Sequence, residues 1–200
     1  MKMDPQVQKF TPKGRATRQR IVDGAAAQIR VHGAVATTLD DVLARTGTSK
    51  SQLFHYFPDG KEQLLLAVAE QEAARVISDQ QPELSQLTSW AAWKRWRDVV
   101  VERYRRQGQQ CPLSTVISEM GRTPGAQAVA TTLIERWRAE IEAGVRAMQR
   151  DGKIAAAVDP KRTAAALLAG IQGGVSVMLN TGDLSYLEAA LDVGIDALRS

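Results

Sequence analysis

The chain has 200 residues, a formal net charge of +4 and a hydrophobic content of 44%. It is long enough for one large domain or for a small domain joined to a larger one, and apolar enough to build real cores. With one cysteine, two histidines and no run of about 20 apolar residues, we expect no disulfide, no metal site, no cofactor and no membrane or signal segment, as in a soluble cytoplasmic protein.

Positive charge gathers near the N-terminus. Residues 1–61 hold ten Lys/Arg against five Asp/Glu, whereas the remaining residues hold 16 against 17. Such a region attracts phosphates, although a basic stretch is also typical of a solvated surface or tail. Residues 1–14 are predicted to be a flexible arm, because Pro5 and Pro12 interrupt any helix there.

Residues 37–61 are predicted to form two short helices joined by a tight turn. Thr38 and Asp41 have the spacing of a capping box, which marks a helix start. Gly47 suits the left-handed conformation that ends a helix, so this helix is expected to end near Thr46.

Ser49 is expected to cap the second helix of the pair. In that helix Leu53, Phe54 and Phe57 are predicted to turn inward. The outward side chains would then be hydrogen-bonding groups of a size that fits a DNA major groove: Thr48, Lys50, Ser51, Gln52, His55 and Tyr56. A helix-turn-helix that reads DNA is the structure that this pattern favours.

Two further helices are predicted around this pair. The first runs from Arg15 to His32 and ends at Gly33; the other begins at Lys61 and continues to about Asp79. Lys61 would lie in a first helical turn, where backbone N–H groups and its own charge can hold a phosphate. These elements predict a DNA-binding domain over residues 15–62 and a second domain over residues 63–200.

The second domain shows helical periodicity and no alternating strand pattern, so the whole chain is predicted to be all-α. Helices are expected over residues 87–107, 111–121, 124–150, 159–180 and 184–198. All four tryptophans lie in this domain. Tryptophan on a helix is either ordinary core packing or contact area for a ligand, and the sequence leaves both open.

Residues 15–68 resemble the TetR family of bacterial transcription regulators. The resemblance depends on the segments His32-Gly33, Thr37-Thr-Leu-Asp-Asp41, Gly47-Thr-Ser-Lys-Ser-Gln-Leu-Phe-His-Tyr-Phe-Pro58 and Gly60-Lys-Glu-Gln-Leu64. The segments Cys111-Pro-Leu113 and Pro58-Asp-Gly-Lys61 further resemble the LmrA/YxaF-like branch. The family resemblance implies an all-helical homodimer with a three-helix DNA-binding head, a ligand-binding body and a dimer interface formed by the last two helices.

We therefore expect a repressor that binds a pseudo-palindromic, double-stranded operator as a homodimer and is released by a small, largely apolar effector. The predicted DNA contacts are Thr38, Thr48, Ser49, Lys50, Ser51, Gln52, His55, Tyr56 and Lys61, with His55 open between phosphate contact and internal packing. The predicted effector contacts are Trp93, Trp96, Met120, Trp137, Ile141, Gln172 and Met178. The predicted dimer contacts are Leu167, Ile171, Gly174, Val175, Leu187, Leu191, Gly194 and Ile195.

Two alternatives belong to other classes of protein. An enzyme would use Cys111 as a nucleophile, but His32 and His55 both lie in the predicted DNA-binding domain, so no Cys/His pair is evident and no catalytic residue is predicted. A ligand-independent DNA-binding protein would not need a second core of this size, which speaks against that alternative.

Overall fold

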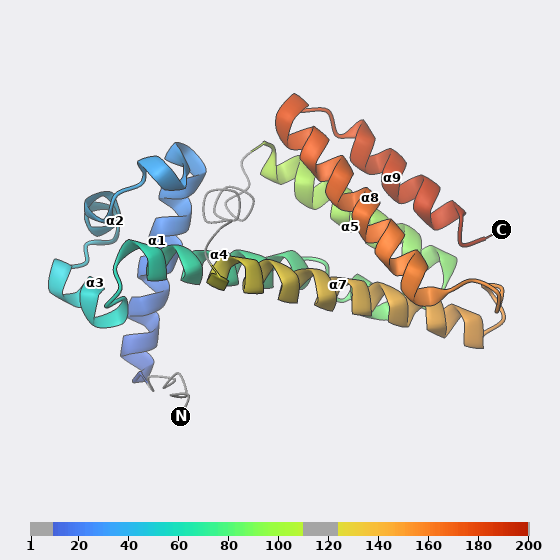
Figure 1. Cartoon of the computed structure of the whole chain (residues 1–200), viewed down its shortest axis with the longest axis horizontal. Helices are drawn as coiled ribbons and strands as arrows, with labels where there is room; N and C mark the ends of the chain where they lie inside the picture. Colours follow the sequence, from blue (N-terminus) through green and yellow to red (C-terminus); the bar gives the residue numbers. More distant parts are fainter. Residues whose placement is uncertain (1–9, 110–123, 200) are drawn as a thin grey trace. The chain divides into compact units, whose positions relative to one another are not determined.

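The computed structural model describes residues 10–109 and 124–199, and these residues form helices, turns and connecting segments without a strand (Figure 1). The all-α prediction is confirmed. The chain divides into two compact units, Met1–Val68 and Ala69–Ser200. The division lies inside helix α4, Lys61–Ser78, six residues beyond the boundary predicted from the sequence.

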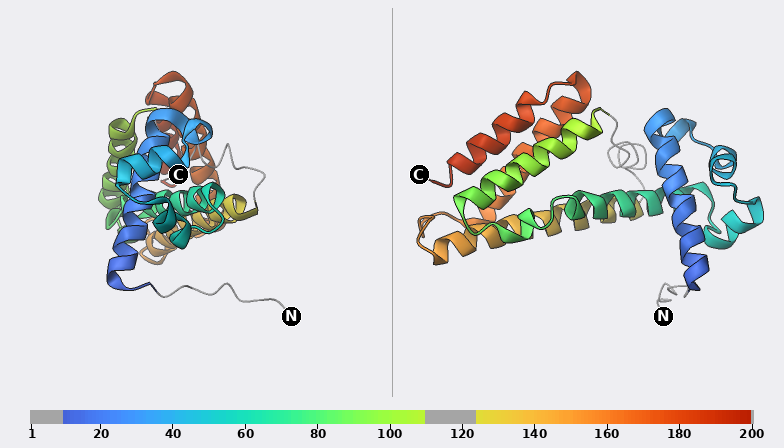
Figure 2. Two further views of the ribbon diagram at one scale, coloured as in Figure 1. Left: turned by 90° about the vertical axis from the view of Figure 1, so that its left-hand side faces the viewer. Right: turned by 180° about the vertical axis from the view of Figure 1, so that it is seen from behind.

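The first unit contains α1 (Pro12–Ala36), α2 (Leu39–Thr46), α3 (Lys50–Tyr56) and the start of α4. Helix α1 packs against both α2 and α3, and Figure 2 shows the two short helices on one side of it. Every helix contributes apolar side chains to a common core: Ile21, Val22, Ala26, Ile29, Val42, Leu53, Phe57, Leu64 and Val68.

Helix α1 begins earlier than the sequence analysis predicted. Thr11 caps it by accepting a hydrogen bond from the backbone N–H of Gly14 at 3.1 Å, and Pro12 takes the first helical position. Proline is well suited to that position because it needs no backbone donor there, so the prediction that Pro12 interrupts a helix is wrong. At its other end α1 breaks at Gly33, as predicted, where φ is 80° and ψ is 164°.

Among the described residues, the second unit holds the rest of α4 and five further helical elements: η1 (Glu83–Gln86), α5 (Trp90–Gln107), α7 (Pro124–Arg150), α8 (Pro160–Thr181) and α9 (Ser185–Asp196). Helices α8 and α9 lie side by side as an antiparallel pair, with α7 against α8 and α5 against α9 (Figures 1 and 2). The predicted helix 111–121 lies outside the described residues.

The segment between α4 and α5 packs on α7. Ser89 caps α5 by accepting a hydrogen bond from the backbone N–H of Ala92, so this helix begins three residues later than Leu87, where it was predicted to begin. Leu87 instead packs on α7 at Gly144, where a Cβ would lie 2.5 Å from the Leu87 Cβ. Glycine at this position therefore permits the close approach of α7 to the segment after η1.

Candidate functional site

Two capping boxes fix the helix-turn-helix. The Thr38 hydroxyl oxygen accepts from the Asp41 N–H at 3.1 Å, and Asp41 accepts from the Thr38 N–H at 2.9 Å. Ser49 and Gln52 repeat the arrangement at α3, with distances of 3.2 and 3.3 Å. Between them Gly47 has φ 60° and ψ 29°, the left-handed conformation that favours glycine. The starts of α2 and α3 and the turn between them are therefore set by local hydrogen bonds and by the backbone conformation of Gly47.

The same bonds stabilise the charged form of Asp41. Hydrogen bonds from the hydroxyl and then the backbone N–H of Thr38 lower the pKa of the Asp41 carboxyl below its ordinary value of 3.8. Desolvation opposes this shift, and the nearby His32 adds to it. A carboxylate in the first turn of α2 also suits the positive end of the helix dipole.

Polar side chains cover the free face of α3. Lys50, Ser51, Gln52 and His55 are exposed, as the helical spacing predicted, and Ser49 is exposed at the cap. The side-chain oxygen of Gln52 is engaged in the capping box, which leaves its amide nitrogen to donate outward. Contact between these groups and DNA stays a prediction.

Two residues of the helix-turn-helix do not face as the sequence suggested. Thr48 was predicted to point outward, but it is only 5% exposed, and its hydroxyl pairs with that of Thr46 at 2.9 Å. Thr46 in turn donates to the Val42 carbonyl at 2.7 Å, so Thr48 belongs to the turn that joins the helices. Phe54 was predicted to point inward and is 39% exposed, because it lies one residue, roughly 100°, from the buried Leu53.

Tyr56 and His55 lie in an aromatic cluster with Phe10, a contact that the sequence analysis missed. The ring centroids of Phe10 and Tyr56 are 5.0 Å apart, and those of His55 and Tyr56 are 4.9 Å apart. The Tyr56 hydroxyl oxygen would be 3.4 Å from a Cβ added at Gly14. The cluster therefore joins the first turn of α1 to the end of α3, and His55 both packs there and remains exposed.

Lys61, the predicted phosphate contact, is the first residue of α4. Its ammonium group donates a hydrogen bond to the backbone carbonyl of Val35 at 3.0 Å. This bond holds the positive charge near the end of α1, where the solvent-facing Val31 and Val35 are 64% and 77% exposed. Lys61 and Val35 both belong to the first unit, so the position of this ammonium group is set within the DNA-binding domain predicted from the sequence.

Most of the predicted effector contacts are buried in the second unit. Trp93, Trp96, Trp137 and Ile141 are 0% exposed, and Met178 is buried as well. Gln172 is half-buried on α8, and Met120 lies outside the described residues. Whether these side chains contact a ligand stays a prediction.

The three buried tryptophans differ in their hydrogen bonding. The Trp96 indole N–H donates to the Gln80 side-chain oxygen at 2.8 Å, while the Gln80 amide donates to the Val76 carbonyl at 2.6 Å. The indole N–H groups of Trp93 and Trp137 have no acceptor among the described residues. Leaving a buried donor unpaired costs about 1–3 kcal/mol, and native structures contain few such groups.

The side chains predicted to form the dimer interface are buried within one chain, and their contact with a second chain stays a prediction. Leu167, Ile171, Val175, Leu187, Leu191 and Ile195 are all buried between α8 and α9 or against their neighbours. A Cβ at Gly174 would lie 2.6 Å from the Leu187 Cα, and one at Gly194 would lie 2.4 Å from the Leu167 Cδ1. Both glycines therefore allow the two helices of one chain to approach closely.

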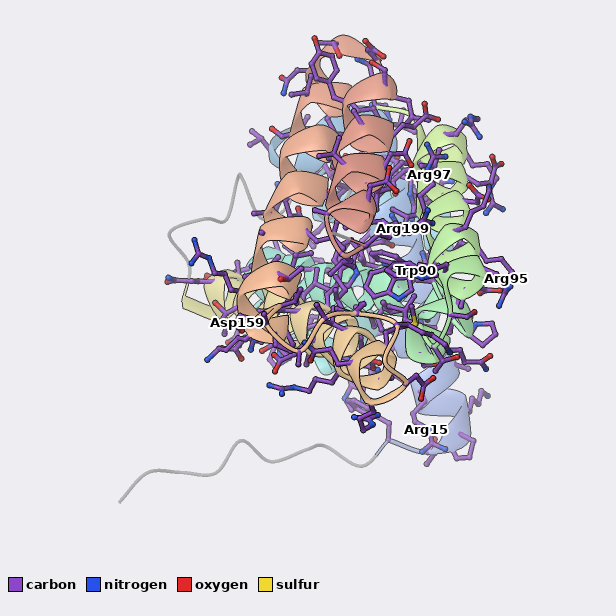
Figure 3. The ribbon with its side chains drawn as sticks, turned by 90° about the vertical axis from the view of Figure 1, so that its right-hand side faces the viewer. Arg15, Trp90, Arg95, Arg97, Asp159 and Arg199 are labelled. Atoms are coloured by element: carbon purple, nitrogen blue, oxygen red, sulfur yellow. The ribbon has the colours of Figure 1, made fainter. Side chains whose placement is uncertain are left out.

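A different face of the α8–α9 pair is exposed. It consists mainly of small or apolar side chains at helical spacing: Ala166, Ala169, Gly173 and Ser176 on α8, and Tyr186, Ala189, Val193 and Ala197 on or just after α9. A groove of about 510 Å³ lies between the helices at the Asp159 end of α8 and includes Ala166, Val193 and Ala197 in its lining. Figure 3 labels Asp159 at this end of α8. We call these eight residues the small-residue face.

Two features of the described residues bear on other classes of protein. Within the described ranges, no group of three or more His, Cys, Asp or Glu side chains is placed to hold a metal ion. Helix α8 is long and apolar enough to cross a membrane by length and composition, but its buried side chains pack against α7 and α9. Cys111, the candidate nucleophile, lies outside the described residues.

Two family models match the chain. One, for bacterial regulatory proteins of the tetR family, matches residues 21–68; the other, a tetracyclin repressor-like C-terminal domain, matches residues 88–193. An HTH-type transcriptional regulator of Mycobacterium tuberculosis is 30% identical over 135 residues. That match covers 60% of this chain and 64% of the relative, less than two thirds of its length.

Solved structures share the fold over nearly the whole chain. A TetR transcriptional regulator from Chloroflexus aurantiacus is 27% identical, with a TM-score of 0.77 over 93% of this chain and 96% of that one. SmeT, the repressor of the Stenotrophomonas maltophilia multidrug efflux pump SmeDEF, is 22% identical, with a TM-score of 0.70 over 94% and 92%. SmeT has also been solved as a complex with triclosan, which matches this chain with a TM-score of 0.71 over 92% of each.

Proposed function

The chain belongs to the TetR family of bacterial regulatory proteins and is a DNA-binding transcriptional regulator, and on that premise we propose that it is a cytoplasmic repressor released from its operator by a small, largely apolar ligand. The observation that carries the DNA-binding part is the exposed polar face of α3, held by two capping boxes. The resemblance of this chain's C-terminal domain to the LmrA/YxaF-like branch stays a prediction.

The repressor acts as a homodimer in this proposal. Two α3 helices enter successive major grooves of a pseudo-palindromic operator, with half-sites about 34–36 Å apart. Ser51 and Gln52 face base edges, and Tyr56 and Lys61 hold phosphates. The small-residue face supports the dimer, because an exposed stripe of small side chains on two helices lets another helix pair approach closely. This face replaces the dimer contacts that the sequence suggested.

Ligand release follows from linkage. A compound that binds the second unit better in a conformation unable to span both half-sites shifts the population away from the operator. The buried tryptophans on α5 and α7 support an apolar ligand, since aromatic side chains supply broad contact area. The triclosan complex of SmeT is a precedent from a protein of the same fold for an apolar aromatic ligand.

Footprinting on genomic DNA with purified protein is the direct test. We expect protection of an imperfect inverted repeat with one dimer or more bound, and loss of protection when a suitable aromatic compound is added. Protection of a single half-site by a monomer would contradict the dimeric mechanism. Protection that no compound in a broad apolar library changes would favour a ligand-independent DNA-binding protein.

A further inference from the structure

Three buried side-chain nitrogens of the second unit have no hydrogen-bond partner among the described residues: the amide nitrogen of Gln107 and the indole N–H groups of Trp93 on α5 and Trp137 on α7. Of these three residues, only the two tryptophans have fully buried side chains, each 0% exposed. Trp96, equally buried, has the Gln80 side-chain oxygen at 2.8 Å. In one core, therefore, one buried tryptophan has a side-chain acceptor for its indole N–H group, and two others have none among the described residues.

The two unpaired indoles lie on two different helices, which the segment after η1 brings close at one end. Leu87 packs on α7 at Gly144, and it precedes Trp93 by six residues, while Trp137 precedes Gly144 by seven. Helix α5 begins at Trp90, and from that end the ribbons of α5 and α7 diverge (Figures 1 and 2).

Trp137 also belongs to the buried stripe of α7, with Leu133, Ile141 and Val145 on the same side. Trp93 packs edge-to-face on Trp96, with ring centroids 5.7 Å apart. The surroundings of both donors are therefore apolar and aromatic. In such surroundings an N–H group discriminates strongly between a partner that offers an acceptor and one that does not, because the second leaves the donor unpaired.

We propose that the effector is an apolar ring compound with an oxygen acceptor, such as a carbonyl or phenolic oxygen, that receives a hydrogen bond from the indole N–H of Trp93, of Trp137 or of both. This proposal rests on the proposed function and narrows its ligand class. The positive end of each N–H dipole faces the ligand, so a hydrocarbon binds more weakly and a cation without an acceptor is disfavoured.

Matched pairs of compounds test this directly on the full-length protein. Fluorenone and fluorene, benzophenone and diphenylmethane, and dibenzosuberone and dibenzosuberane each differ by a carbonyl in place of a methylene group. By titration calorimetry, we expect at least one ketone to bind tenfold or more tightly than its methylene partner. Three pairs with no preference for the ketone would overturn the proposal.

Single substitutions then locate the donor. In W93F or W137F, which keep an aromatic ring and lose the N–H, the preference for the ketone should disappear. W90F is the matched control, because Trp90 is only half-buried and packs against the Arg199 guanidinium (Figure 3). The guanidinium carbon of Arg199 is 4.8 Å from the centroid of the Trp90 ring. A ketone preference that survives unchanged in both W93F and W137F would overturn the assignment.

The wild-type protein provides a second readout if a phenylalanine variant does not fold. In a proton–nitrogen correlation spectrum, the ketone should move one or two of the four indole N–H resonances downfield, and its methylene partner should not. Equal shifts with both compounds would contradict the proposal. A ketone that binds with the indole shift but leaves operator DNA bound would instead contradict ligand-relieved repression and leave the indole assignment standing.

Discussion

At the scale of single residues, Asp41 makes the stability of the helix-turn-helix depend on pH. Its pKa is lowered in the folded protein by hydrogen bonds from Thr38, so folding favours its ionised form. The resulting stability is present above the ordinary carboxyl pKa and is lost as the pH falls through the lowered value. Asp41→Asn should therefore be less stable than wild type at neutral pH, with the difference shrinking between about pH 5 and pH 2.

Thermal unfolding followed by circular dichroism at several pH values measures this. Asp40→Asn is the control, because it removes the same charge from the same helical turn and leaves the capping box intact. Identical pH profiles for the two variants would mean that the dipole, and not the capping box, supplies the effect.

We expect the charge of Lys61 to contribute to DNA affinity and to its dependence on salt concentration. Lys61→Ala should weaken binding on all sequences alike and lower the salt dependence by about one unit per subunit, as expected for one lost phosphate contact. Fluorescence anisotropy over a range of salt concentrations measures the slope. Lys94→Ala removes an exposed lysine from the second unit and is the control. An unchanged slope in Lys61→Ala would leave its bond to the Val35 carbonyl as its main role.

Gln52 should act on specificity instead. Gln52→Ala is expected to relax the preference at one base position, because it removes the amide N–H group that the capping box leaves free to face a base edge. A binding assay against operators substituted at each position measures this, and a uniform loss over all positions would point to a phosphate contact. The Gln52→Glu variant provides a comparison, because it retains a side-chain acceptor for the capping box.

The local part of this site could be predicted from the sequence. Thr38, Asp41, Ser49 and Gly47 act on neighbours within three residues, so their spacing contains the necessary information. The prediction for Phe54 was an error of helical phase, because the residue after the buried Leu53 is turned by roughly 100°. The burial of Thr48 depends on the pairing of its hydroxyl with that of Thr46, which the spacing of helix starts and ends does not specify. The contact between Phe10 and Tyr56 joins residues 46 positions apart and has no local signal.

At the scale of elements, α8 and α9 approach so closely that one added methyl group should separate them. Gly174→Ala places a Cβ 2.6 Å from the Leu187 Cα, a backbone atom that cannot move without the helix. We expect destabilisation of about 1–3 kcal/mol, as for other overpacked cores. Chemical denaturation of the purified protein measures it.

Gly170 is the matched control, one turn away on the same helix. A Cβ there would lie 3.5 Å from the Ala190 Cβ, an ordinary contact. Gly170→Ala should therefore be neutral or stabilising by up to about 1 kcal/mol, because alanine is the better helix former. Equal losses in both variants would mean that glycine flexibility, and not the close approach, matters in α8.

The same helix pair shows what periodicity predicts and what it leaves open. The apolar stripes of α8 and α9 correctly identified buried residues such as Ile171 and Leu191, together with the helices that carry them. A stripe does not say whether a helix of the same chain or of a second chain covers it. The sequence analysis assigned the stripe to a second chain, and in the structure the partner helix of the same chain covers it.

At the scale of the whole molecule, the small-residue face should hold the dimer. Val193 of this face is 70% exposed, so Val193→Arg adds a long charged side chain without disturbing the core of one chain. We expect this variant to sediment as a monomer at micromolar concentration and to lose affinity for a two-half-site operator. Ala139→Arg, on an exposed position of α7, is the control. A dimeric Val193→Arg would place the interface elsewhere.

The positions of the tryptophans make their fluorescence a probe of one unit of the protein. All four indoles, at positions 90, 93, 96 and 137, belong to the second unit, and the first unit has none. Intrinsic emission excited at long wavelength therefore reports on the second unit alone, with no background from the helix-turn-helix. Trp93 and Trp96, held 5.7 Å apart with an interplanar angle of 87°, are close enough for their transitions to couple. Near-ultraviolet circular dichroism of this pair offers a label-free record of any rearrangement in the core.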